Sequence, residues 1–182
     1  MNTFLTILFI IIVLILILLI TYIILYNKIN ETIIRINEAE NRIDSNLRDK
    51  YDTLNRASTL IKSQIKLKDD DFKDILKLKS RKISNFELDR SLVKIHDEFI
   101  SIYENNKELR DSDEIYKAYK QLELIDEELV TLRNYYNGNI SSYNKMIKKF
   151  PTLIIAKIKK YDEKLFYDLK NQNDNDYEDF KL

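Results

Sequence analysis

The N-terminal apolar run is the feature that most constrains the fold of this chain. Residues 4–25 number 22, of which 19 are Leu, Ile, Val or Phe, and the first charged side chain is that of Lys28. As a helix rising ~1.5 Å per residue, the run spans roughly 33 Å, which is enough for a hydrocarbon core of about 30 Å. We therefore predict a transmembrane anchor over residues 1–27, with the lipid bilayer as the partner of residues 4–25.

A cleaved secretory signal is the alternative interpretation of this run. Such a signal has a basic start, an apolar stretch of about 7–15 residues and a small-residue cleavage site. Residues 1–3 carry no Lys or Arg, and residues 21–26 offer no such site, so we favour the anchor. Four basic residues follow the run and none precedes it, which predicts a single-pass cell-membrane protein whose large C-terminal domain lies in the cytoplasm. These residues are Lys28, Arg35, Arg42 and Arg48.

The rest of the chain has the composition of a helical domain. All sixty Lys, Arg, Asp and Glu residues follow residue 27, and the 182 residues include one Gly and one Pro. This scarcity disfavours sheets with tight turns and long irregular loops. The absence of cysteine excludes disulfides and thiolate chemistry. A net charge of zero disfavours nucleic acid as a partner.

Apolar residues recur at helical spacing in the first two segments that follow the anchor. Residues 29–65 predict one helix of some forty residues, ending near residues 68–71, and its continuity with the membrane helix is left open. The stripe of residues 72–102 changes phase near residue 84. Ser84-x-x-Glu87 fits a capping box there, so we expect the helix to break and restart at that point.

The last long segment has the most regular stripe. Residues 111–114, Asp-Ser-Asp-Glu, fit another capping box at its start, and Pro151 ends it because proline disfavours helix in the preceding residue. A short helix is expected over residues 152–161, and residues 168–182 form an acidic tail that we predict to be disordered. The stripe comprises Ile115, Tyr119, Leu122, Ile125, Leu129, Leu132, Tyr136, Ile140, Tyr143, Ile147 and Phe150.

These patterns together predict an all-α fold. Helices with one apolar face must bury it, and short connections place neighbouring helices antiparallel. We expect a single transmembrane helix followed by an up-and-down bundle of three to four long antiparallel helices over residues 28–167.

The chain resembles the LemA family of bacterial membrane proteins. The resemblance lies in an Arg-x-x-Tyr-Asn, Tyr-Asn, Phe-Pro pattern near the end of the last long segment, with matching residues after the apolar run and in the first soluble helix. The residues are Tyr26, Asn27, Ile43, Asp44, Arg48, Asp52, Arg133, Tyr136, Asn137, Tyr143, Asn144, Phe150 and Pro151. The resemblance implies a single membrane span, a helical bundle and no established enzymatic activity.

The aromatic residues of this pattern have two interpretations. Tyr136, Tyr143 and Phe150 are seven residues apart, so they share one helix face, with Asn137 and Asn144 on the adjoining face. The strip could recognise a partner helix. We favour aromatic residues that fill the core and asparagines that fix the packing.

Charged residues of the pattern also favour a structural role. Asp44 and Arg48 are four residues apart and can pair on one helix face, which contributes ~0.3–0.5 kcal/mol if they are exposed. If they instead meet Arg133 across the bundle, the buried cluster would fix the register of the helices. A run of lysines could contact anionic lipid, although a solvated helix face is the commoner explanation. The run comprises Lys145, Lys148, Lys149, Lys157, Lys159 and Lys160.

No catalytic or metal-binding constellation is evident. The segment around His96 resembles the phosphoacceptor site of sensor kinases, but a chain with one glycine lacks the Gly-rich nucleotide-binding domain. A lone histidine also builds neither a di-iron nor a zinc site. Asp174, Asp176 and Glu178 alternate as in a calcium loop, yet Asp179 occupies the position that needs glycine. We predict no cofactor, no metal and no enzymatic activity.

The predicted function is that of a membrane-anchored scaffold or adaptor of the LemA type. Its partner would be an unidentified membrane or cytoplasmic protein, and homo-oligomerisation is left open. A coiled-coil membrane tether or receptor fragment is one alternative, which dimerisation of the water-exposed domain would favour. An unrecognised enzyme is the other, and a cofactor or metal bound to the purified protein would indicate it.

Overall fold

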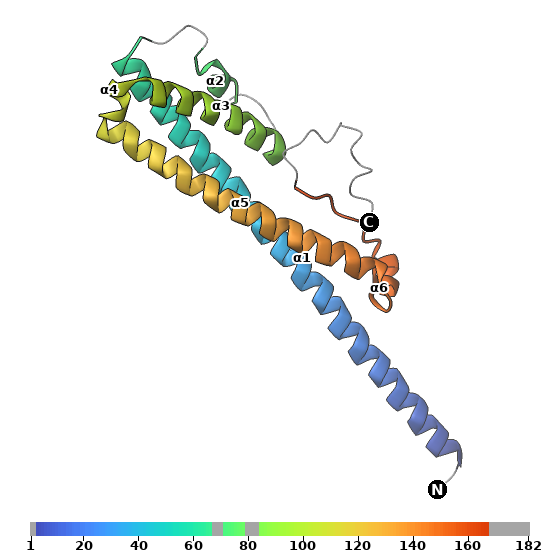
Figure 1. Cartoon of the computed structure of the whole chain (residues 1–182). Coiled ribbons are helices and arrows are strands. Elements are labelled where there is room, and N and C mark those ends of the chain that lie inside the picture. Colours follow the sequence, from blue (N-terminus) through green and yellow to red (C-terminus); the bar gives the residue numbers. More distant parts are fainter. Residues whose placement is uncertain (1–2, 67–70, 79–83, 168–182) are drawn as a thin grey trace. The chain divides into compact units, whose positions relative to one another are not determined.

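The computed structural model describes residues 3–66, 71–78 and 84–167, and those residues form six helices and no strand. This confirms the predicted all-α class. The helices are α1 (Thr3–Gln64), α2 (Lys73–Leu78), α3 (Asn85–Asn105), α4 (Lys107–Arg110), α5 (Asp113–Lys148) and α6 (Thr152–Lys159) (Figure 1).

Helix α1 is continuous from the apolar run into the charged part of the chain. It comprises 62 residues without Gly or Pro, so nothing in its sequence interrupts the backbone hydrogen bonds. The helix ends at Gln64, a few residues before the expected end. Residues 68–70 of the predicted acidic turn lie outside the described residues, while Asp71 lies in a turn before α2.

The predicted restart near residue 84 is confirmed. The Glu87 backbone N–H donates to the Ser84 hydroxyl at 3.3 Å, and the Ser84 backbone N–H donates to the Glu87 carboxylate at 3.4 Å. These two bonds satisfy backbone donors that have no partner within the helix. Between α1 and this box, the six residues of α2 are the helical ones among those described, and residues 79–83 are not described. Helix α4 is a single turn that the sequence stripes do not predict.

The C-terminal elements follow the sequence prediction to within two residues. Helix α5 ends at Lys148, Pro151 lies at the N-cap of α6, and α6 ends at Lys159. Lys160 then adopts a left-handed conformation with φ of 53°, which terminates the helix. The predicted acidic tail, residues 168–182, lies outside the described part of the chain.

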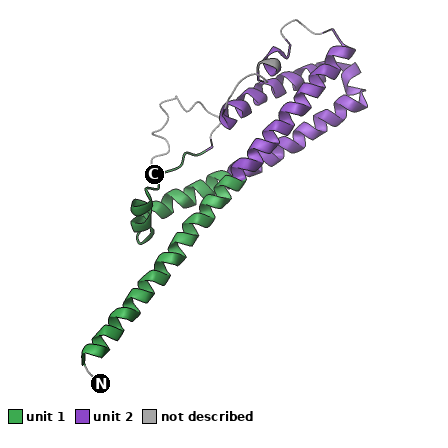
Figure 2. Cartoon of the chain, turned by 180° about the vertical axis from the view of Figure 1, so that it is seen from behind, with its two compact units in different colours: residues 1–38, 136–166 green, residues 39–135, 167–182 purple. Residues whose placement is uncertain are grey.

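The chain divides into two compact units, each containing part of α1 and part of α5 (Figure 2). Unit 1 combines residues 1–38 with residues 136–166, and unit 2 combines residues 39–135 with residues 167–182.

In unit 2, α5 runs antiparallel to both α1 and α3. Side-chain hydrogen bonds join Arg42 to Glu128, Arg56 to Gln121 and Gln64 to Ser112. Residue numbers therefore increase along α1 in the direction in which they decrease along α5. Pairs between α3 and α5 show the same opposed order. The apolar part of the core between these helices includes Ile43, Leu47, Leu54, Ile61, Leu92, Ile95, Phe99, Leu122 and Leu129.

In unit 1, a small core joins α1, α5 and α6. Its buried members are Ile29, Ile36, Ile140, Tyr143, Ile147, Ile155 and Ala156. The stretch of α1 before this core extends away from the other described helices of unit 1 (Figure 2). Its side chains are exposed from Thr3 to Ile24 apart from the half-buried Val13. By length and composition, α1 is the one helix among those described that could cross a membrane.

Candidate functional site

A buried ionic cluster joins α3, α5 and the segment after α6 in unit 2. Asp89 is fully buried, and Arg133 donates to both of its carboxylate oxygens, from Nε at 2.9 Å and from Nη2 at 2.8 Å. The Tyr167 hydroxyl donates to Asp89 at 3.0 Å, and the Tyr167 ring lies 6.0 Å from the Arg133 guanidinium and 4.4 Å from the Phe86 ring. Asp89 thus fixes two segments that are distant in sequence.

The chemistry of this cluster favours a structural role. A bidentate arginine–carboxylate pair is directional and charge-assisted, so it fixes the relative position of α3 and α5. Burial, together with the adjacent negative charge of Asp89, raises the pKa of the Tyr167 hydroxyl far above its ordinary value. Tyr167 therefore stays protonated and acts as a donor at physiological pH.

A second polar cluster joins all three long helices of unit 2. Lys50 on α1 is almost fully buried, and its Nζ donates to Asp126 on α5 at 2.5 Å. His96 on α3 places Nδ1 2.8 Å from the other oxygen of the same carboxylate. Among the described residues, the buried Nε2 of His96 has no hydrogen-bond partner. Asp126 is therefore the common acceptor of this cluster.

The carboxyl group of Asp126 is held in its charged form. Burial alone would raise its pKa, but the hydrogen bonds from His96 and Lys50 and the charges of these groups outweigh burial and lower the pKa below its ordinary value. A carboxyl with a lower pKa in the folded state stabilises the fold above its unfolded pKa. That contribution is lost as the pH falls through the folded pKa.

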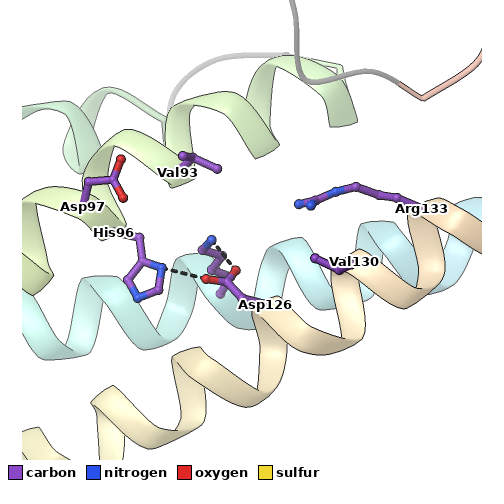
Figure 3. Close-up of a pocket in the computed structure, with 7 residues that line it drawn as sticks. Val93, His96, Asp97, Asp126, Val130 and Arg133 are labelled. Carbon is purple, nitrogen blue, oxygen red and sulfur yellow. Dashed lines mark hydrogen bonds and ion pairs between the residues drawn. The ribbon is translucent and has the colours of Figure 1, made fainter.

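A cavity of about 230 Å³ opens beside the two clusters. Figure 3 shows the His96 ring directed toward Asp126, with the Arg133 side chain also extending into the region. A histidine oriented by a carboxylate is the arrangement of a general base. However, no hydroxyl or thiol nucleophile lines the cavity, whose walls are formed by Lys50, Val93, His96, Asp97, Asp126, Val130 and Arg133.

The structure gives the first of the two arrangements considered for Asp44 and Arg48. Asp44 and Arg48 pair with each other at 2.9 Å on the exposed face of α1, whereas Arg133 pairs with Asp89. A buried cluster that fixes helix register does exist, but its acid comes from α3. Helical spacing identifies the face of a residue on its own helix, whereas the residue opposite depends on the packing between helices.

The aromatic strip is only partly core. Tyr143 is 2 % exposed, as expected for a core position, whereas Tyr136 is only half-buried and Phe150 is 75 % exposed. The prediction for Phe150 was wrong because α5 ends at Lys148, so helical spacing no longer applies two residues later.

The asparagine of the second Tyr-Asn pair holds the segment that follows α6. The Asn144 side chain donates to the Lys164 carbonyl at 2.9 Å and accepts from the Lys164 backbone N–H at 2.9 Å. This two-way bond agrees with the predicted role in packing. Asn137 is half-buried.

The remaining residues of the LemA-like pattern lie at several places. Tyr26 packs against the core of unit 1, and Asn27 next to it is exposed. Asp52 is exposed on α1. Pro151 begins α6. They do not form one site.

The sequence analysis did not identify Lys50, Asp89, Asp126 or Tyr167, and it considered His96 only as a phosphoacceptor or metal ligand. For Lys50, Asp89 and His96 a signal was present. Lys50 lies three residues after Leu47 and four before Leu54, and thus in the buried stripe of α1. Asp89 and His96 lie at the corresponding positions of α3. A charged or titratable residue at a stripe position indicates a buried polar partner on another helix, because isolated burial of such groups is costly.

No group of three or more metal-ligating side chains occurs within residues 3–66, 71–78 and 84–167. Fold and site together define an all-α protein in which three long helices are fixed by two buried ionic clusters. Comparison with known families matches the LemA family over residues 39–178, and the chain therefore belongs to that family. No curated protein matches the chain.

Proposed function

We propose that this LemA family protein is a scaffold or adaptor held to a membrane by α1. The observation that carries the proposal is the exposure of the apolar part of α1. Large side chains there lie outside any core, for example Phe4 at 72 % and Leu18 at 70 % exposure. Exposing so much apolar surface to water is unfavourable, at about 25 cal/mol per Å², whereas a bilayer would cover it.

Helix continuity supports the scaffold part of the proposal. Because α1 runs to Gln64 without a break, one continuous helix carries both the anchor and residues of unit 2. The buried ionic groups of unit 2 are paired with one another, which supports a structural role for them. We therefore propose that the protein is not an enzyme and that it acts through contacts with another protein or with the membrane surface.

The proposed orientation places unit 2 in the cytoplasm. Lys28, Arg35, Arg42 and Arg48 all lie on α1 within about 25 residues after the apolar run. An excess of Lys and Arg beside a span marks the cytoplasmic side.

Single cysteines test the anchor and its orientation together, since the natural chain has none. With Ile15→Cys, a membrane-impermeant thiol reagent is expected to label the protein only after denaturation, because the bilayer covers position 15. With Leu124→Cys, which replaces a side chain that is 67 % exposed in unit 2, labelling is expected after the cells are permeabilised but not in intact cells.

The two variants test different parts of the proposal, the spanning helix and its orientation. Labelling of position 15 in permeabilised cells without denaturation would contradict the spanning helix. Labelling of position 124 in intact cells would contradict the orientation and leave the anchor in place.

Crosslinking in living cells tests the scaffold role. A photoreactive residue in place of Leu124, an exposed apolar side chain on α5, is expected to give a discrete adduct with a second protein. The same residue in place of Asn134, an exposed polar position ten residues later and about 80° around α5, controls for random collisions. Equal background labelling at both positions would contradict a scaffold that uses this face. An adduct of twice the chain's mass would instead favour the coiled-coil tether.

A further inference from the structure

Helix α6 in unit 1 is apolar on both sides. One side is buried through Ile155 and Ala156. The opposite side is not covered: Ile154 is 52 % and Ile158 is 66 % exposed, and these residues lie four apart on one face. Phe150, just before the helix, is 75 % exposed. Three large apolar side chains therefore project from a short element that already has a core face.

The position of α6 in unit 1 brings it to the end of the apolar run. Tyr26 directly follows the run, and the Lys159 ammonium lies 5.4 Å from the centre of its ring. The Tyr161 hydroxyl donates to Asn30 at 3.4 Å. Asn30 lies five residues beyond Leu25, which is about 7.5 Å along a helix. If the run crosses a bilayer, α6 lies at the depth of the lipid headgroups.

Both the aromatic residues and the charge at this level suit a membrane interface. Tyr22 and Tyr26 stack with ring centres 6.1 Å apart at the end of the run, and tyrosine is enriched where membranes meet water. Residues 145–164 contain seven lysines and two acids, a net charge of +5. Of these lysines, Lys148 pairs with Glu163, while Lys149 and Lys157 are exposed. This excess of positive charge complements anionic lipid headgroups.

We propose that α6, with Phe150, is a second membrane-docking element that lies in the interface of the bilayer spanned by α1 and prefers anionic lipids. Phe150, Ile154 and Ile158 enter the boundary between headgroups and acyl chains, and the neighbouring lysines contact lipid phosphates. An amphipathic helix binds in this way, with its apolar side buried ~5–10 Å below the surface. The inference rests on the proposed anchor and adds a contact that the anchor does not require.

Fluorescence quenching in nanodiscs tests the proposal on the full-length protein. Ile158→Cys carries an environment-sensitive dye, and the nanodiscs contain phosphatidylcholine with or without phosphatidylglycerol, plus lipid spin-labelled near the headgroup. We expect the dye to be quenched, and to be quenched more strongly when phosphatidylglycerol is present. Because Ile158 is exposed, its replacement leaves the core intact, and circular dichroism verifies the helix content.

Two further positions separate this inference from the anchor. Ile34→Cys replaces another exposed isoleucine of unit 1, nine residues or about 13 Å beyond the run, and its dye should remain unquenched. Ile15→Cys should be quenched by lipid labelled deep in the acyl chain. Quenching at position 15 without quenching at position 158 would overturn the docking of α6 and leave the anchor standing. Loss of quenching at both positions would overturn the anchor and the inference together.

A double variant tests the proposed preference of α6 for anionic lipids. Lys149→Gln with Lys157→Gln removes two exposed charges and leaves the apolar face unchanged. Each lysine is expected to change the docking equilibrium on anionic lipid about fivefold. The preference of α6 for phosphatidylglycerol should therefore fall about 25-fold in the double variant. An undiminished lipid effect would overturn the assignment of Lys149 and Lys157 as contacts of anionic headgroups.

Discussion

Replacing Asp89 with alanine is expected to lower the free energy of unfolding by ~3–5 kcal/mol, because it leaves a buried guanidinium without its carboxylate. The Arg133 side chain is 15 % exposed and Asp89 is fully buried, so water replaces the lost hydrogen bonds only in part. Tyr167 loses an acceptor in the same step. Chemical denaturation of the full-length protein in detergent, followed by circular dichroism, measures the change.

Asp44→Ala is the matched control for this prediction. It also removes a carboxylate from an arginine pair, but Arg48 is 73 % exposed and that pair is screened by water. Its loss should cost only ~0.3–0.5 kcal/mol. Equal effects of the two variants would mean that Asp89 is solvated and that its cluster does not hold α3 to α5.

A double variant distinguishes pairing from packing. Asp89→Leu with Arg133→Met replaces both charges by apolar groups of similar size, and such exchanges of buried pairs are often neutral or stabilising. We expect it to recover most of the stability that Asp89→Ala loses. If the double variant is as unstable as the single one, the volume at position 89 matters more than its charge.

The sequence contained more information about the helices than about the contacts between them. Local signals were sufficient for the two helical segments that α1 joins, though not for their continuity, and for the Ser84 box and the end of α5 before Pro151, because each depends on residues within one or two turns. The partner of Arg133 was missed because Asp89 lies 44 residues away and only packing brings the two together. Lys50 and His96 were visible as polar residues in apolar stripes, but their common acceptor, Asp126, lies beside its own stripe.

Phe150 shows the limit of extending a periodic pattern. Its seven-residue spacing from Tyr143 holds only while the helix continues, and Pro151 ends the helical conformation before that position. The same aromatic residue then becomes available for the interface proposed for α6. An apparent core residue beside a helix-ending proline is therefore better interpreted from the helix boundary than from the stripe.

Tyr143→Ala should destabilise unit 1 by ~3–5 kcal/mol, since it removes a buried aromatic ring and leaves a cavity. The ring lies in the core with Ile140 and Ile147, and its centre is 6.5 Å from that of Tyr161. Burial, with smaller contributions from Tyr161 and Asp162, raises the pKa of the Tyr143 hydroxyl. Because the ring lies in the core that these helices share, its loss weakens the packing of α5 against both α1 and α6.

Phe150→Ala provides the control within the same aromatic strip. This residue is seven positions later and 75 % exposed, so its removal should change the free energy of unfolding by less than about 0.5 kcal/mol. Unfolding in detergent, followed by circular dichroism, compares the two variants. An unchanged midpoint for Tyr143→Ala would mean that the ring is dispensable for folding, and the strip would become a candidate binding surface. If the expected difference is found, the two aromatic residues have different roles: Tyr143 holds the helices together, while Phe150 is available for the membrane contact proposed for α6.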